Sequence, residues 1–199
     1  MAKAMRRSPK ARLILILAAL SSLVGGYYLG QYWQRRPLTD LSAVVYPSGL
    51  QIDYPAGLTI PDAGGTPSVW RLFLVADTRE QACSQLLDHY AFVFNRLAAW
   101  PSIQARLRLS VLAYDRPDAT SLDTFVGGRD WVDVITGDTA QLDSLSAQLG
   151  ILPGGGHWCS DTQANAILVS PERANWALIP HEQAAIMARN IGTIIDFVE

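Results

Sequence analysis

A long uncharged apolar segment near the start of the chain constrains its fold more than any other feature. No charged residue occurs from Leu13 to Gln34, and Leu13–Leu29 is almost wholly apolar or small. About 20 helical residues, each rising about 1.5 Å, cross the hydrocarbon core of a bilayer, which is about 30 Å thick. Aromatic residues gather at the far end of the segment, as is typical of a membrane interface: Tyr27, Tyr28, Tyr32 and Trp33. We therefore predict a transmembrane anchor over residues 13–34.

The basic residues around this segment predict its orientation. Residues 1–12 hold five of them, Lys3, Arg6, Arg7, Lys10 and Arg12. Because positive charge marks the cytoplasmic side, we expect a basic cytoplasmic tail over 1–12 and export of everything after Arg36. The expected protein is single-pass in a bacterial-type inner membrane, with a periplasmic C-terminal domain. A cleaved signal peptide is the alternative, since "ALSS" at residues 19–22 offers a weak small-residue cleavage site.

The charge of the exported part excludes some classes of partner. Nine arginines follow Arg36, against eighteen acidic side chains, so this part carries a formal charge of −9. Phosphate backbones and anionic lipid surfaces attract basic proteins, so we expect no nucleic-acid partner. The acidic surface serves either solubility or the docking of a basic protein patch.

Apolar periodicity predicts an α/β domain over residues 66–199, after a Pro/Gly-rich linker and small hairpin over 35–65. Short apolar runs predict strands and stripes at three- and four-residue spacing predict helices. The expected order is strand 69–76, helix 79–99, strands 107–115 and 131–137, a helix capped by Asp138, a hairpin over 165–180 and a final helix. A right-handed strand–helix–strand unit followed by a hairpin gives a mixed sheet with helices on both faces. This is the outline of a thioredoxin-like fold.

Three features together resemble the Sco/SenC family, the membrane-anchored copper chaperones of cytochrome c oxidase assembly. They are the single N-terminal anchor, the strand-to-helix turn "DTREQACSQLL" with its cysteine, and the late loop before the hairpin "AILVSPERANWALIP". The resemblance covers roughly Leu38 to the end of the sequence. It implies a thioredoxin-like domain and a protein partner in a respiratory oxidase or its assembly machinery.

The metal motif of that family is degenerate in this chain. The family holds copper with a CxxxC at the first helix and a histidine before the hairpin. Cys83 matches the second cysteine, but Arg79 stands at the first, and the histidine position falls near Thr162, after Asp161.

A relocated copper site remains conceivable, because the family's fold brings the late loop to the start of the first helix. Cys83, Cys159 and His157 would be its metal ligands, and thiolates and imidazole suit Cu(I). Two other interpretations stay open: a Cys83–Cys159 disulfide, and a buried inert Cys83 on the apolar stripe of its helix.

The sequence holds no other catalytic pattern. It has no CxxC, no Ser-His-Asp order with a nucleophile elbow and no evident acid–base pair of carboxylates. We therefore expect a protein that is not an enzyme, with copper as its one candidate cofactor. The expected function is that of a Sco-like accessory protein in oxidase assembly. The alternatives are a periplasmic thiol-disulfide redox protein and a docking module without chemistry.

Overall fold

The computed structural model describes residues 9–58, 60, 69–151, 159 and 164–199. It separates into two units, Met1–Asp40 and Leu41–Glu199. The first unit is built on one helix, α1 (Pro9–Thr39). Within α1, Leu13–Gly30 is long and apolar enough to cross a membrane, and none of this window is buried. This helix is a candidate membrane span, as the sequence predicts.

The second unit is built around one mixed sheet of six strands. Their order across the sheet is β1-β6-β5-β2-β3-β4. The parallel half contains β2, β3 and β4, and the other three strands run antiparallel to their neighbours. The strands are β1 (Val44–Gln51), β2 (Trp70–Ala76), β3 (Leu107–Ala113), β4 (Val132–Ile135), β5 (Ala166–Val169) and β6 (Ala174–Ile179). This arrangement confirms the thioredoxin-like fold expected from the order of the elements.

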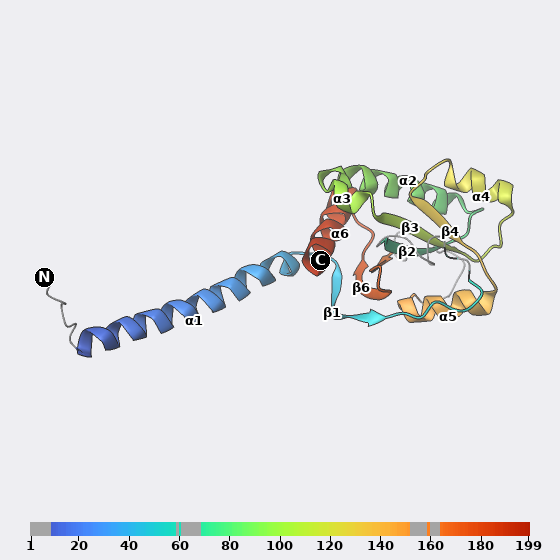
Figure 1. Ribbon diagram of the computed structural model, residues 1–199. Helices are drawn as coiled ribbons and strands as arrows, with labels where there is room; N and C mark the ends of the chain where they lie inside the picture. Colours follow the sequence, from blue (N-terminus) through green and yellow to red (C-terminus); the bar gives the residue numbers. More distant parts are fainter. Residues whose placement is uncertain (1–8, 59, 61–68, 152–158, 160–163) are drawn as a thin grey trace, which may run out of the picture. The chain divides into compact units, whose positions relative to one another are not determined.

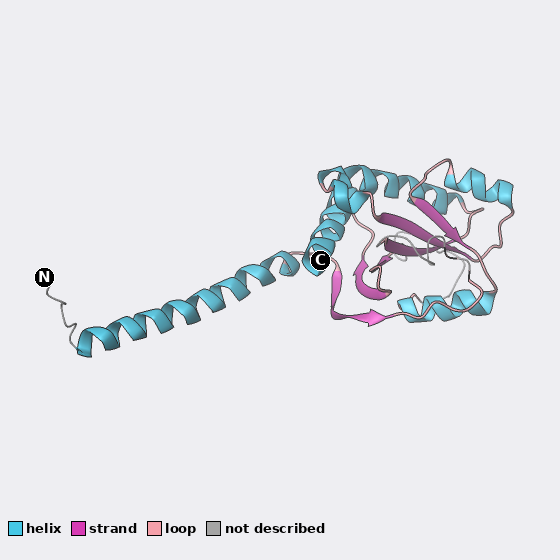
Figure 2. Cartoon of the chain, viewed as in Figure 1, coloured by secondary structure: helices cyan, strands magenta, loops and turns pink. Residues whose placement is uncertain are grey.

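Helices flank the strands on both sides, as Figures 1 and 2 show. On one side lie α2 (Gln81–Arg96), the short helices η1 (Leu97–Ala99) and α3 (Pro101–Gln104), and α6 (Ala184–Val198), which packs against α2. On the other side lies α5 (Thr139–Leu149). The eight-residue α4 (Ala119–Val126) connects β3 to β4 and begins at Asp118, whose side chain accepts a hydrogen bond from the Ser121 backbone.

The apolar runs of the sequence form the hydrophobic core. Every residue of β2 is buried, as expected for a strand with helices on both faces. On the α5 side, Leu142, Leu145 and Leu149 pack against Phe73 and Val75 of β2. Asp138 caps α5 in a capping box with Gln141, which confirms the predicted helix start.

The structure differs from the sequence expectations in the segment 35–65. Helix α1 continues to Thr39, and Val44–Gln51 is not half of a separate hairpin but strand β1, paired antiparallel with β6. This strand is irregular, because its register shifts between Val45 and Leu50. Gly49 has a φ of +63°, which favours glycine, and a Cβ there would lie 3.1 Å from that of Ala174. The pairing joins residues about 130 positions apart, so periodicity could not reveal it.

The start of α2 also differs. Thr78 with Gln81 suggests a capping box, but the helix begins two residues later than expected, after Glu80, and has no side-chain cap. The Thr78 hydroxyl instead donates a 2.6 Å hydrogen bond to the carboxylate of Asp115. Asp115, which is distant in the sequence, therefore replaces the local partner expected for Thr78.

Candidate functional site

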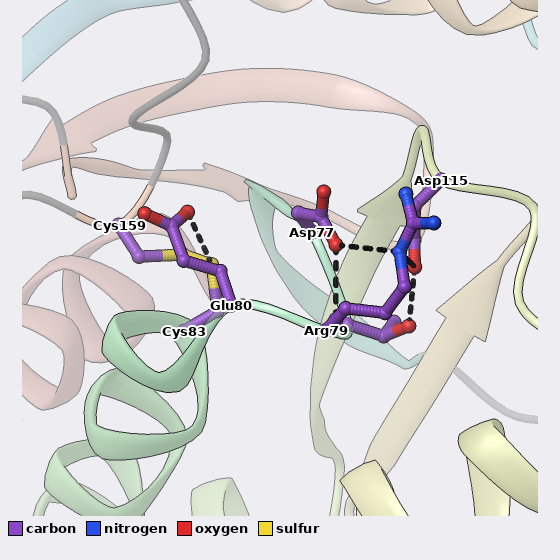
Figure 3. Close-up of polar contacts among 7 residues, drawn as sticks. Asp77, Arg79, Glu80, Cys83, Asp115 and Cys159 are labelled. Atoms are coloured by element: carbon purple, nitrogen blue, oxygen red, sulfur yellow. Dashed lines mark hydrogen bonds and ion pairs between the residues drawn. A yellow bond between two sulfur atoms is a disulfide. The ribbon is translucent and has the colours of Figure 1, made fainter.

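The two cysteines meet at the start of α2. Cys83 lies in the first turn of this helix, and Cys159 belongs to the segment between α5 and β5. A disulfide joins them, with their Cα atoms 4.9 Å apart (Figure 3). Cys83 is 2% exposed and Cys159 is 5% exposed, so both sulfur atoms lie in the core. The bond ties the start of α2 to the segment that precedes β5.

The Glu80 carboxylate lies against this disulfide. Its Oε2 is 3.7 Å from the Sγ of Cys83, as Figure 3 shows. A disulfide sulfur carries no hydrogen, so the contact is a close approach of a negative charge to sulfur rather than a hydrogen bond. The carbonyl oxygen of Glu80 accepts from the backbone N–H groups of Cys83 (3.0 Å) and Ser84 (3.3 Å). The main chain of Glu80 is therefore held to the first turn of α2.

Arg79 forms a second cluster one residue earlier. Its Nε lies 3.4 Å from Oδ1 of Asp77 and 3.4 Å from Oδ2 of Asp115 (Figure 3). The Arg79 backbone N–H also donates to Asp77. The Arg79 side chain is 70% exposed, whereas that of Asp115 is only 1% exposed. The guanidinium therefore supplies a positive charge beside a buried carboxylate, whose other oxygen has no hydrogen-bond partner among the described residues.

A small pocket of about 250 Å³ opens beside Arg79. The start of α2 and the exposed side of α4 form its walls, and Phe125 is its one aromatic lining residue. The other lining residues are hydroxyl side chains around the arginine: Thr78, Ser84, Thr120, Ser121 and Thr124. The hydroxyl groups and the guanidinium are its polar groups, and the disulfide is not part of its lining.

The described residues do not form a copper site in this state. Cys83 and Cys159 are bonded to each other, and a disulfide sulfur is not the thiolate ligand that Cu(I) selects. Arg79, which the sequence resemblance assigns to the other motif cysteine, supplies a guanidinium and no thiolate. Across the ranges that the structure describes, no three His, Cys, Asp or Glu side chains are grouped as metal ligands. His157, the third proposed ligand, lies outside those ranges, as do Asp161 and Thr162.

The other two histidines, His89 and His181, contact each other. Their rings lie 4.6 Å apart between centroids, in a tilted arrangement. Nε2 of His89 lies 2.9 Å from the carbonyl oxygen of Glu182, to which it donates. His89 is therefore half-buried between α2 and the segment before α6.

Sequence reasoning missed Asp77, Glu80 and Asp115. Asp77 and Glu80 flank Arg79 in the quoted turn, so their proximity was visible, but nothing indicated where their side chains point. Asp115 follows β3, and only the parallel pairing of β2 with β3 brings it beside Thr78 and Arg79. The one available signal was that Asp77 follows β2 and Asp115 follows β3. These two strands are parallel neighbours, so their carboxyl ends meet at one edge of the sheet.

No protein-family model matches the chain, and no curated protein matches it in sequence. Among solved structures, ScoI of Arabidopsis thaliana with copper bound is similar with a TM-score of 0.50 and 13% sequence identity, covering 64% of this chain and 83% of that one. Yeast Sco1 with copper bound gives 0.49 and 12%, covering 65% and 78%. BsSco, a member of the Sco family of cytochrome c oxidase assembly proteins, gives 0.48 and 14%, covering 65% and 80%. At such identities a likeness shows the fold alone, and residues 41–199 have a thioredoxin-like fold similar to that of the Arabidopsis thaliana structure.

Proposed function

We propose that this chain is a membrane-anchored, Sco-like accessory protein in the assembly of cytochrome c oxidase, with a degenerate copper site. The fold shared with ScoI of Arabidopsis thaliana supports the Sco-like part of the proposal. The candidate membrane span in α1 supports the anchor. The basic residues within 1–12 support the orientation, with these residues in the cytoplasm and the domain in the periplasm. The chain would then act by docking an oxidase subunit or another assembly factor.

One observation carries the degenerate site: Arg79 occupies the place of the first motif cysteine and is paired with two carboxylates. An arginine at this place supplies no thiolate, so only one of the two CxxxC ligands is present, and Cu(I) binding that depends on thiolates is weakened. The Cys83–Cys159 bond removes both thiolates from the ligand set as long as it is intact. We infer that copper binds only to the reduced chain, weakly, and through Cys83, Cys159 and His157.

The assembly role is tested in a deletion strain of the source organism, grown at limiting copper. We expect low cytochrome c oxidase activity that is restored by the full-length chain. If the double variant Cys83→Ser/Cys159→Ser also restores oxidase activity, the chain acts by docking without thiol or metal chemistry. Normal oxidase activity in the deletion strain would refute the assembly role, whatever the chemistry of the cysteines.

The copper inference is tested by anaerobic Cu(I) titration of the reduced full-length chain in detergent, against a competing chelator. We expect weaker binding than in Arg79→Cys, which restores two cysteines at CxxxC spacing. Tight one-to-one binding that survives both Cys83→Ser and Cys159→Ser would refute the proposed ligand set.

A thiol-disulfide redox protein is the second candidate, favoured by a disulfide at the start of the first helix of this fold. Helix N-termini stabilise thiolates, and many thiol oxidoreductases use this position. The burial of both sulfur atoms argues against rapid exchange with a partner. An insulin-reduction assay separates the candidates, because only a redox protein accelerates the reaction.

A further inference from the structure

We propose that Glu80 protects the Cys83–Cys159 disulfide against thiol exchange, because its carboxylate opposes the negative charge that thiol attack builds on the sulfur atoms. The structural basis is the 3.7 Å approach of the Glu80 carboxylate to the Sγ of Cys83. The inference concerns the chemistry of this bond and stands independently of the oxidase role.

The sequence position of Glu80 gives its charge a specific effect. Glu80 directly precedes Gln81, the first residue of α2, and Cys83 lies in the first turn. The partial positive charge at a helix N-terminus would by itself stabilise a thiolate on Cys83 and make the bond easier to reduce. A carboxylate at the same helix end counteracts that stabilisation. The two effects act on the same sulfur with opposite signs.

The exchange reaction shows where the charge appears. A thiolate of a dithiol reductant attacks the Sγ of Cys159 and forms a mixed disulfide, while the Cys83–Cys159 bond breaks. Cys83 leaves with the electron pair as a thiolate and takes a proton from water. The second thiolate of the reductant then attacks its own sulfur in the mixed disulfide and releases Cys159, which is also protonated. The protein gains two electrons and two protons, and the reductant ends as a disulfide.

Negative charge thus approaches or develops beside Glu80 in the first step. Attack on Cys159 places the leaving thiolate on Cys83, next to the carboxylate. Attack on Cys83 instead brings the incoming thiolate itself toward the carboxylate. Either route is slowed by the same repulsion, whereas the burial of the sulfur atoms slows both equally and does not depend on Glu80.

The test compares the oxidised full-length chain with Glu80→Gln in detergent, with dithiothreitol as the reductant at constant pH. We expect Glu80→Gln to raise the second-order rate constant at least about fivefold, the effect of removing one of two unit charges about 4 Å apart in water-like surroundings. Asp196→Asn is the matched control, because it removes the same charge from the exposed side of α6. Asp196 lies one helical turn after Gly192. Gly192 packs on Trp100, which lies at the end of α2 opposite to Cys83.

Two further measurements distinguish charge from a structural role. Added salt should speed reduction of the unmodified chain more than that of Glu80→Gln, since salt screens the charge that only the unmodified chain carries beside Cys83. In a Cys159→Ser background, alkylation of Cys83 by iodoacetamide should reach half its maximal rate at a lower pH when Glu80→Gln is added, because a nearby carboxylate disfavours the thiolate. Equal reduction rates for the unmodified chain and Glu80→Gln, or an equal acceleration in Asp196→Asn, would overturn the proposal.

Discussion

Arg71 and Asp133 form a buried ion pair across the parallel half of the sheet. The Nη1 of Arg71 in β2 lies 2.6 Å from Oδ2 of Asp133 in β4, and their side chains are 5% and 13% exposed. The same nitrogen donates to the Ser110 hydroxyl of β3, the strand between them, at 2.9 Å. One nitrogen of Arg71 therefore joins three adjacent strands through two polar contacts, one to Ser110 and one to Asp133.

Removing one member of this pair should destabilise the domain strongly. Asp133→Asn leaves the Arg71 guanidinium in the core without its carboxylate, and such changes cost about 3–5 kcal/mol. Urea unfolding of the full-length chain in detergent, followed by tryptophan fluorescence, measures the loss. Asp123→Asn, on the exposed side of α4, is the control and should change the free energy of unfolding by less than about 0.5 kcal/mol. Equal stability of the two variants would show that the ion pair contributes little.

The disulfide should contribute substantially to stability, because it links residues 76 positions apart. Closing a loop of that length reduces the entropy of the unfolded chain and stabilises the native state by about 4 kcal/mol in the chain-entropy model. We expect Cys83→Ala/Cys159→Ala to lower the unfolding midpoint in urea. Reductant should lower the midpoint of the unmodified chain and leave that of the double variant unchanged. An identical midpoint for the oxidised chain and the double variant would contradict a stabilising role.

Stability should depend on pH through Glu199. Its carboxylate accepts hydrogen bonds from Arg106 (2.7 Å) and from the Trp70 indole (3.0 Å). The bond from Arg106, with a smaller effect of Trp70, lowers the pKa of Glu199 below its usual value, although partial burial acts in the opposite direction. A carboxyl group with a lowered native pKa stabilises the fold above its unfolded pKa, and this contribution is lost as the pH falls through the native value.

Thermal unfolding of the unmodified chain and Glu199→Gln should therefore differ at neutral pH and converge in acid. We expect the difference to begin to shrink near pH 4.3, the ordinary pKa of a glutamate, and to vanish below the lowered native pKa. Because the carboxylate is 40% exposed, the effect at neutral pH should stay below about 1 kcal/mol. A difference that persists unchanged into strong acid would mean that Gln fails at this position for steric rather than electrostatic reasons.

The proposed topology makes a prediction for reporter fusions. Alkaline phosphatase fused after Glu199 should be active, because it folds only on the exported side, and a cytoplasmic reporter at the same point should be inactive. N-terminal sequencing of the membrane-bound protein distinguishes an anchor from a signal peptide. An N-terminus near Ser22 would replace the anchor with a cleaved signal.

The sequence was sufficient to predict the elements that depend on local patterns. The apolar run around Leu72 predicts β2, and Asp138 with Gln141 predicts the start of α5. Each of these patterns depends on only a few consecutive residues. The thioredoxin-like order followed from the succession of such segments. These features arise from short-range periodicity and from backbone groups that must be satisfied locally.

Contacts between distant segments could not be predicted in the same way. Thr78 had a plausible local partner in Gln81, but its hydroxyl bonds to Asp115, which is brought close only by strand pairing. The sequence comparison assigns Arg79 to the motif position, but it could not predict the pairing of Arg79 with Asp115, which depends on how the ends of β2 and β3 lie side by side. The sequence left three interpretations of Cys83 open, since its environment depends on where Cys159 lies.

The irregularity of β1 has a consequence for how other proteins can be recognised. This edge strand contains Pro47, which has no N–H to donate, and its register is broken before Leu50. At the other edge, β4 offers only four residues. Short or interrupted edge strands are poor templates for an added strand from another chain. We therefore expect this domain to resist β-augmentation and edge-to-edge aggregation, and to engage other proteins through side chains on its helices and loops.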